Sequence, residues 1–377
     1  MRYILKNYDT PLVIFDMSVD CMNGLTIQYK ESFAEHEKQF PLDLALTDAG
    51  IEKWLRKRVI PKNRAFVHEI LKALNLSYND LKGIIDVCKG LSLNDSYWIV
   101  PMDFKGKYAD YNLYENKFSK VLSLVAYTGI GGGVTPFTTS PELTTNGMLA
   151  KSWRTVKGEV YLYKAGTEGF ANAGKEPYSE FYAYQIAEVM GLDAVYYNLG
   201  KWKGKLCSIC PLFTDIDTAY VPIGRVVTEG GMRAVMKYYR ELGEEYYQQL
   251  VSMIVFDAVI CNEDRHFGNF GILRDNRTGE ILRPAPIFDN GLSLFNYAMD
   301  DDFEDIAAYA QTRRTADGAD HVERARLVMG ARQKEQLRHL LNFKFQRHAT
   351  YNLSAKRLKK IEMFVQARAR ELLDERV

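Results

Sequence analysis

Short apolar runs separated by turns open the chain and predict strands. Within residues 1–30 these runs are "YILKN", "PLVIFDM" and "LTIQY". From residue 47 the apolar residues recur with helical periodicity, which predicts helices in "DAGIEKWLRKRV", "RAFVHEILKALNL" and "YNDLKGIIDVCKGL". We therefore expect residues 1–120 to form an N-terminal extension of strands followed by helices, and to be mostly helical.

Alternating patterns after residue 150 predict two hairpins with a helix between them. "KSWRTV" and "GEVYLYKAG" flank a Lys-Gly turn, and "VYYNLGKWKGKLCSICPLF" turns at Lys203-Gly204. The helix "PYSEFYAYQIAEVMGL" has Pro177 and Ser179 at its start and Gly191 at its end. Residues 121–213 are therefore predicted to form a small sheet lobe.

Residues 214–377 are predicted to be mostly helical, apart from the stretch 262–295. The last helix, "AKRLKKIEMFVQARARELL", carries one apolar face, made of Leu358, Ile361, Phe364 and Leu372. The order of elements favours the α+β class, with a small antiparallel sheet lobe followed by a larger helical lobe.

Composition narrows the class of protein. Of the 377 residues, 47% are hydrophobic and 26% charged, which is ordinary for a folded soluble protein. The net charge is +1, which gives no overall attraction to nucleic acid or to an anionic membrane. The early run "PLVIF" is too short for a signal sequence or a membrane span. We expect no membrane partner.

The five cysteines are an odd number, which favours a reducing compartment over a disulfide framework. We therefore expect the protein to be cytoplasmic. Cys207 and Cys210 form a C-x-x-C pair, but no second pair stands at a spacing that suits zinc. Packing in the core is favoured over a metal or redox site.

Polar residues crowd into "CNEDRHFGNFGIL" (261–273), directly after the apolar run "VSMIVFDAVI". The spacing from Asp264 to Asn269 is one that phosphoryl-transfer enzymes use: the aspartate accepts the proton of the attacking hydroxyl and the asparagine offers an oxygen to Mg²⁺. Asp289, in "IFDNG", stands at a strand end before a turn, where a carboxylate can hold Mg²⁺ against phosphate. Turn capping is the alternative for Asp264 or Asn269 alone.

Lys164 and Glu180 are the candidates for a second charged pair. Lys164 lies in the apolar strand "VYLYKAG" and Glu180 lies early on the helix that follows. Kinases hold the α- and β-phosphates of the nucleotide with a strand lysine and a helix glutamate. A solvent-facing lysine is the alternative. Glu176 is a rival for Glu180, but it precedes Pro177 and is expected to lie outside the helix.

Two segments compete as the backbone cradle for phosphate. "GIGGG" (129–133) has no strand on either side and is interpreted as a connector. "TTNGMLAKSW" (144–153) leads into the first predicted hairpin; in it Gly147 would let the backbone approach phosphate and Lys151 would add positive charge.

These motifs together resemble the HipA-like serine/threonine kinases. "NEDRHFGNFG" is similar to the Asn-x-Asp-x-His-x-x-Asn catalytic loop of that family, and "IFDNG" stands where the family has its metal aspartate. "TTNGMLAK" resembles the family's Ser-x-x-Gly-x-x-x-Lys loop, and "SEFYAYQIAEVMGL" resembles one of its helices. The similarity covers roughly residues 140–300, with helices beyond.

The resemblance implies a bilobal protein-kinase-like fold and a role for each matched residue. Asp264 would be the base, Asn269 and Asp289 would bind magnesium, Lys164 would contact nucleotide phosphate, and His266 would orient the catalytic loop. A hinge within "ICPLFTD" (209–215) would bind adenine through its backbone, at Pro211, Leu212 and Phe213. Thr144 stands at the position of a serine that the family autophosphorylates.

The leading hypothesis is an ATP- and Mg²⁺-dependent kinase that phosphorylates Ser or Thr of a protein whose identity the sequence does not indicate. A phosphoinositide-type or small-molecule kinase is the first alternative, because such enzymes also use Asp-Arg-His-x-x-Asn. A catalytically silent nucleotide- or DNA-binding regulator, with helices at 51–90 as its contact module, is the second. The candidate DNA-reading helix near "LSLNDSYWI" has no Arg or Lys, so we expect no direct nucleic-acid partner.

Overall fold

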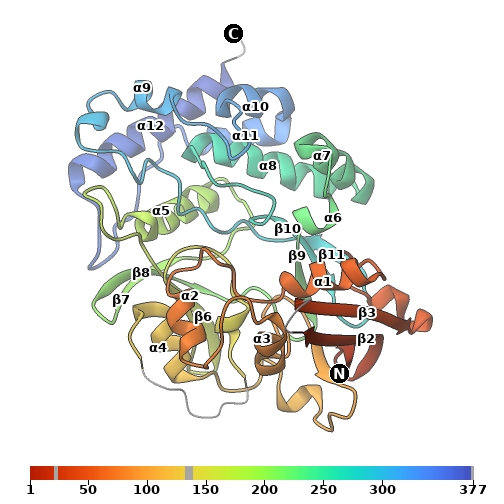
Figure 1. Cartoon of the computed structure of the whole chain (residues 1–377). Helices are drawn as coiled ribbons and strands as arrows, with labels where there is room; N and C mark the ends of the chain where they lie inside the picture. The colour runs from red at the N-terminus through yellow and green to blue at the C-terminus, as the bar shows by residue number, and fades with distance from the viewer. Residues whose placement is uncertain (21–23, 132–138, 375–377) are drawn as a thin grey trace. The chain divides into compact units, whose positions relative to one another are not determined.

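The computed structural model describes residues 1–20, 24–131 and 139–374 (Figure 1). Contacts divide the chain into two compact units. The first unit comprises Met1–Tyr163, Leu212–Val221 and Leu273–Leu282; the second comprises Lys164–Pro211, Pro222–Ile272 and Arg283–Val377. The division into 1–120, 121–213 and 214–377 stays a prediction. The predicted connector 129–133 runs into 132–138, which lie outside the described residues.

An antiparallel four-stranded sheet forms the centre of the first unit. Its strands are β1 (Arg2–Asn7), β2 (Thr10–Asp20), β3 (Gly24–Ser32) and β4 (Tyr97–Pro101), in the order β3-β2-β1-β4. Tyr3 pairs with Phe15, and Leu5 pairs with Ile99. Alternate residues face opposite sides of a strand, and here both sides are buried: Tyr3 and Leu5 pack in one apolar cluster and Ile4 in another.

Three short helices cover one face of this sheet. They are α1 (Asp48–Arg56), α2 (Val67–Lys72) and α3 (Leu81–Cys88), and their buried side chains belong to the cluster that contains Tyr3. Thr47 and Asp80 cap α1 and α3, because their side-chain oxygens accept hydrogen bonds from Gly50 N and Gly83 N. The predicted strands and helices are thus confirmed, although each helix is shorter than its pattern.

Two expectations about residues 1–120 were wrong. The region is not mostly helical, because a four-stranded sheet stands at its centre and β4 follows the helices. No helix forms at "LSLNDSYWI", where a packing helix without DNA-reading side chains was expected: the segment is a loop that leads into β4, where Trp98 and Ile99 are buried. Aromatic and β-branched residues fit a sheet that is buried on both faces better than they fit a helix surface.

The two predicted hairpins are confirmed and belong to one sheet, of order β5-β6-β8-β7. Its strands are β5 (Lys151–Val156), β6 (Glu159–Ala165), β7 (Asn198–Trp202) and β8 (Lys205–Pro211). The turns Lys157-Gly158 and Lys203-Gly204 have positive φ at both residues, as two-residue hairpin turns require. A third sheet has the order β11-β10-β9, from Ile281–Pro284, Gly271–Asp275 and Thr218–Pro222.

Helix α8 (Glu244–Ile260) is the core of the second unit, and every residue from Leu250 to Ile260 is buried. Four helices contact it (Figure 1): α7 (Gly231–Leu242), α10 (His321–Val328), α11 (Ala331–Arg338) and α12 (Ala355–Leu373). The predicted apolar face of α12 is buried. The remaining helices are α4 (Lys120–Thr128), α5 (Glu176–Val189), α6 (Ile223–Val226) and α9 (Ile306–Gln311). No helix in the described ranges is long and apolar enough to cross a membrane.

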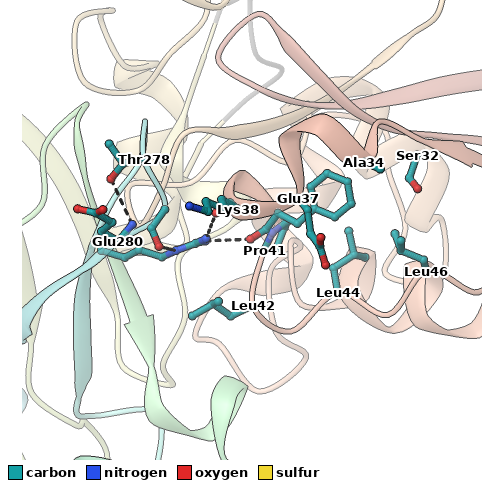
Figure 2. A pocket seen from close by; sticks show the side chains of 13 residues that line it. Ser32, Ala34, Glu37, Lys38, Pro41, Leu42, Leu44, Leu46, Thr278 and Glu280 are labelled. Atoms are coloured by element: carbon teal, nitrogen blue, oxygen red, sulfur yellow. Dashed lines mark hydrogen bonds between the residues drawn. The ribbon is translucent and has the colours of Figure 1, made fainter. Parts of the chain in front are cut away.

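A surface cavity of about 650 Å³ lies in the first unit, and none of the predicted site residues lines it. Leucines after the 3-10 turn Ala34–Gln39 and residues of the β10–β11 turn line it, and Figure 2 shows both groups. Arg274 joins the two segments: it donates hydrogen bonds to Gly279 O at 2.8 Å, to Phe40 O at 2.9 Å and to Lys38 O. This buried arginine therefore holds the cavity wall through backbone carbonyls.

His321, the first residue of α10, is buried without a hydrogen bond to either ring nitrogen from any described residue. Burial lowers its pKa to about 4, whereas an exposed histidine titrates near 6.5. Below pH 6.5 the unfolded chain therefore binds a proton that the folded chain does not bind. The contribution of His321 to stability is present above pH 6.5 and falls as the pH drops toward 4.

We predict that His321→Leu makes unfolding less sensitive to acid. Between pH 7 and pH 5 the wild type should lose about 2 kcal/mol of unfolding free energy more than the variant, from the difference between the two pKa values. Urea unfolding at both pH values measures this. His68→Leu, at an exposed position on α2, is the control and should follow the wild type. Equal pH dependence in His321→Leu and the wild type would contradict the prediction.

Candidate active site

Lys164 is buried at the end of β6, where it meets two carboxylates of the second unit. Its ammonium donates to Glu180 Oε1 at 2.8 Å and to the carboxylate of Asp289. Burial alone would lower the pKa of Lys164, but Asp289 and Glu180 outweigh it and raise that pKa. Lys164 is therefore a fixed cation and does not point to solvent.

Helix α5 places Glu180 against this lysine, and the side chain of Glu180 is fully buried. Its second oxygen, Oε2, accepts a hydrogen bond from Asn290 N at 2.8 Å. Glu176 begins the helix, contrary to the expectation that it lies outside, and its carboxylate accepts from the Thr167 hydroxyl at 2.7 Å. Glu180 is nonetheless the partner of Lys164, as the sequence predicted.

Asp289 follows the apolar residues of "IFDNG" in a left-handed backbone conformation, with φ of 55°. Aspartate tolerates this region better than most residues do. Its backbone N–H donates to the Tyr197 hydroxyl at 3.0 Å, and its carboxylate reaches Lys164. The side chain of Asp289 remains about a third exposed to solvent.

The loop after α8 is a series of turns, which are held by hydrogen bonds between residues of the loop. Asp264 N donates to Asn262 Oδ1 at 3.1 Å, and His266 N donates to Asp264 O at 2.7 Å. The exposed ring of His266 accepts a hydrogen bond from Gly268 N at 3.0 Å through Nδ1. His266 thus shapes the turn that leads to Asn269.

Asn269 is oriented by its own loop. Its Nδ2 donates to Asp264 O at 2.9 Å, and a carbonyl can only accept, so Oδ1 must face the other way. No described residue donates a hydrogen bond to the Asp264 carboxylate, and burial raises the pKa of this group, with Asp289 adding to the effect and His266 opposing it. The amide oxygen of Asn269 and the carboxylate of Asp264 can therefore accept hydrogen bonds from a ligand or bind it.

Arg265, which the sequence analysis passed over, joins these parts. Its guanidinium binds both oxygens of Asp257 at 3.0 Å each, Asn269 O at 3.0 Å, Phe288 O at 2.6 Å and Asn290 Oδ1 at 2.6 Å. These five hydrogen bonds use all five N–H groups of an arginine. Arg265 therefore fixes the loop of Asn269 relative to the segment of Asp289.

Four more residues were missed, and one of them had a signal. Asp257 is a lone carboxylate within the apolar run of α8, and a carboxylate buried in a helix needs a partner. Asn262 supports it, with Nδ2 at 3.0 Å from Asp257 Oδ1. Asn290 and Tyr197 are ordinary polar residues in the sequence, and only the fold brings them to Arg265 and Asp289.

The other predicted site residues are divided between the units. Pro211 ends β8 in the second unit, whereas the remaining ones, Thr144, Gly147, Lys151, Leu212 and Phe213, belong to the first. Gly147 has φ of 89°, and Lys151 Nζ donates to Asn146 O at 2.9 Å. Thr144 is buried, and its hydroxyl donates to Leu91 O at 2.7 Å. Leu212 N donates to Val160 O at 2.9 Å, so the amide of this predicted hinge residue already has a hydrogen-bond partner.

Cys207 and Cys210 are buried, in agreement with the expected role in the core. Burial raises the pKa of the Cys210 thiol to about 12. Within the described residues, no group of three or more His, Cys, Asp or Glu side chains could hold a metal ion. Any metal at this site would depend on the amide oxygen of Asn269 together with Asp289.

Comparison with known proteins shows which proteins the chain resembles. No family model matches the chain. The chain resembles the HipA-like serine/threonine kinases in fold and in sequence, which confirms the expected resemblance and the α+β class. The structural likeness is to HipA of Shewanella oneidensis MR-1, solved with HipB and its operator DNA, with a TM-score of 0.51, 13% identity and 100% of both chains covered.

The sequence likeness is to the serine/threonine-protein kinase CtkA of Helicobacter pylori. The two are 27% identical over 139 residues, and the match covers 33% of this chain and 42% of the length of CtkA. A crystal structure of the H. pylori proinflammatory kinase CtkA aligns with a TM-score of 0.45 and 20% identity, over 59% of this chain and 91% of that one. The chain thus matches less than half of the curated kinase.

We predict that Asp257→Asn destabilises the protein strongly, because it leaves the buried guanidinium of Arg265 without its counter-charge. The loss should be about 3 kcal/mol in unfolding free energy, as for other broken buried pairs. Urea denaturation measures it. The control is Asp193→Asn, which breaks a half-exposed pair with Arg283 of 2.6 Å and should cost less than about 1 kcal/mol. Similar losses in the two variants would refute the central place of Arg265.

Proposed function

We propose that the chain is an ATP- and Mg²⁺-dependent protein kinase that transfers the γ-phosphate to Ser or Thr of a protein substrate. The observation that carries the proposal is the buried Lys164, shared between Glu180 and Asp289. Phosphoryl transfer depends on positioned charge more than on covalent chemistry. A strand lysine, a helix glutamate and an aspartate beside a catalytic-type loop supply that charge.

Lys164 binds the α- and β-phosphates in this proposal, and Glu180 holds the lysine in place. Asn269 Oδ1 and the Asp289 carboxylate would hold Mg²⁺, because hard oxygen donors suit this ion and it needs only one or two side chains when phosphates supply its other ligands. When bound, the metal neutralises charge on the phosphate oxygens. With Mg²⁺ bound, the Asp289 carboxylate would be a ligand of the metal, and Glu180 would still hold Lys164 in place beside the phosphates.

Asp264 is the proposed base. Its carboxylate has no hydrogen-bond donor among the described residues and a raised pKa, so it can accept the proton of an attacking hydroxyl. The base works only when ionised, and activity should therefore decline as the pH falls through its pKa. His266 holds the loop that carries it, through the hydrogen bond from Gly268.

The assignments made from the resemblance remain part of the proposal. Gly147 and Lys151 would cradle phosphate, and the backbone at Pro211, Leu212 and Phe213 would bind adenine. Phosphorylation of Thr144 requires its hydroxyl to leave Leu91 O first. Mass spectrometry of the peptide 144–151 after incubation with ATP tests whether Thr144 becomes phosphorylated.

The proposed partners are ATP and a protein substrate, with no direct contact to nucleic acid or membrane, and the proposed location is the cytoplasm. The direct experiment is incubation of the protein with labelled ATP, Mg²⁺ and generic protein acceptors. Label on Ser or Thr supports the proposal. Nucleotide binding without transfer to any acceptor, or to the chain itself, would favour a silent regulator instead.

We expect Asp264→Asn to abolish transfer while folding and ATP binding remain, since the change removes the base but keeps its shape. The loss should be about 10²- to 10⁴-fold in kcat. Glu263→Gln is the matched control, because it neutralises the neighbouring carboxylate, which pairs with Arg313 at 3.5 Å. If Asp264→Asn kept more than about a tenth of the wild-type rate, Asp264 would not be the base.

Asp289→Asn should weaken binding of Mg·ATP but not of metal-free ATP. The carboxylate acts through Mg²⁺, and its removal also releases Lys164 from one of its two carboxylates, which favours free nucleotide. Calorimetry with Mg²⁺ and with a chelator separates the two effects, with Asp193→Asn as the surface control. Loss of both affinities in equal measure would count against a metal role.

A further inference from the structure

Arg64 is a second buried arginine, placed in the loop before α2. Its side chain is inaccessible to solvent, and so is that of Glu142, which it meets at 2.6 Å. The two residues lie far apart in sequence but within the same unit. Two charges are withdrawn from water only at a large cost in free energy, so the contacts that compensate for it are informative.

Those contacts run along the segment that contains Gly147. The guanidinium of Arg64 donates to Glu142 O at 3.2 Å, to Thr145 O at 2.9 Å and to Lys151 O at 3.0 Å. Backbone carbonyls on both sides of the glycine are therefore attached to one rigid side chain.

Glu142 extends the same attachment into β5. Its Oε1 accepts from the Ser152 hydroxyl at 2.9 Å and from Trp153 N at 3.1 Å. A main-chain hydrogen bond adds to it, from Ala65 N to Met148 O at 2.7 Å. Arg64, Ala65 and Glu142 thus make hydrogen bonds that hold the stretch 142–153 at six positions: 142, 145, 148, 151, 152 and 153.

Residues 146–148, at the tip of this stretch, are exposed. Both arms of the loop are fixed while its tip faces solvent with the backbone of Gly147 in the left-handed region. A loop that is ordered before its ligand arrives loses less conformational entropy on binding. That arrangement suits a backbone that has to meet an anion.

We propose that Arg64 is a positioning residue for the phosphate loop, residues 142–153. The N-terminal region, which contains Arg64, would then contribute to nucleotide binding by ordering this loop. The inference rests on the proposed kinase function, in which Gly147 and Lys151 bind phosphate. Arg64 touches neither the nucleotide nor the reacting atoms; it acts by holding the carbonyls of Thr145 and Lys151. Nucleotide affinity should therefore depend on it more than turnover does.

The test compares Arg64→Lys with Arg274→Lys in the full chain. Lysine keeps the charge but lacks the planar fork that reaches several carbonyls at once. Arg274 is the matched control, a buried arginine of the same unit that also binds backbone carbonyls, and none of the partners named above for it lies in 142–153. The first measurement is hydrogen exchange of peptides from 140–153 without nucleotide, and the second is KM for Mg·ATP together with kcat.

Arg64→Lys should speed exchange in 140–153 and raise KM, each by about tenfold, while kcat changes far less. Arg274→Lys should leave both at wild-type values. Unchanged exchange would overturn the attachment itself. Faster exchange with an unchanged KM would overturn its role in nucleotide binding. If the wild type binds no ATP, the kinase proposal fails, and the exchange data still decide whether Arg64 orders the loop.

Ser152→Ala provides a milder variant in case Arg64→Lys does not fold. It removes one of the two hydrogen bonds to Glu142 Oε1 and leaves both charges in place. Exchange and KM should rise in the same direction by a smaller factor. A fall in thermal stability without either rise would show that the pair only stabilises the fold.

Discussion

A lysine ammonium enclosed between two carboxylates is the interaction on which the candidate site depends. Without Glu180 and Asp289, burial would drive the proton off Lys164, and without the lysine the two carboxylates would repel each other. Each of the three charged groups thus offsets the free-energy cost of burying the others. The strand β6, the helix α5 and the segment at Asp289 meet at this lysine, and the candidate site therefore lies where three separate parts of the chain come together.

Several residues of this site were predictable because charged side chains stand at characteristic positions within apolar strands, helices and turns of the sequence. Lys164 in an apolar strand, Glu180 one turn into the next helix and Asp289 before a turn each stand out against their neighbours. Glu176 shows the limit of such reasoning: Pro177 suggested that the helix starts after it, but proline is accepted in the first turn, where its missing N–H costs nothing.

What could not be predicted lies in contacts between residues distant in sequence. Arg265 sits inside the recognised motif, yet the pattern says nothing of Asp257, Phe288 or Asn290. The strand β4 was missed for a similar reason: a short apolar stretch becomes a strand only because β1 offers an edge to pair with. Arg64 and Glu142 likewise gain meaning only once the fold brings them together.

The complete use of the Arg265 donors has an evolutionary consequence. Replacement by any other side chain strands several acceptors at once, because none presents five N–H groups in one plane. A single substitution at position 265 should therefore not be tolerated. Arginine can be replaced during evolution only together with a change at position 257. Positions 257 and 265 should vary together among descendants of this chain, or not at all.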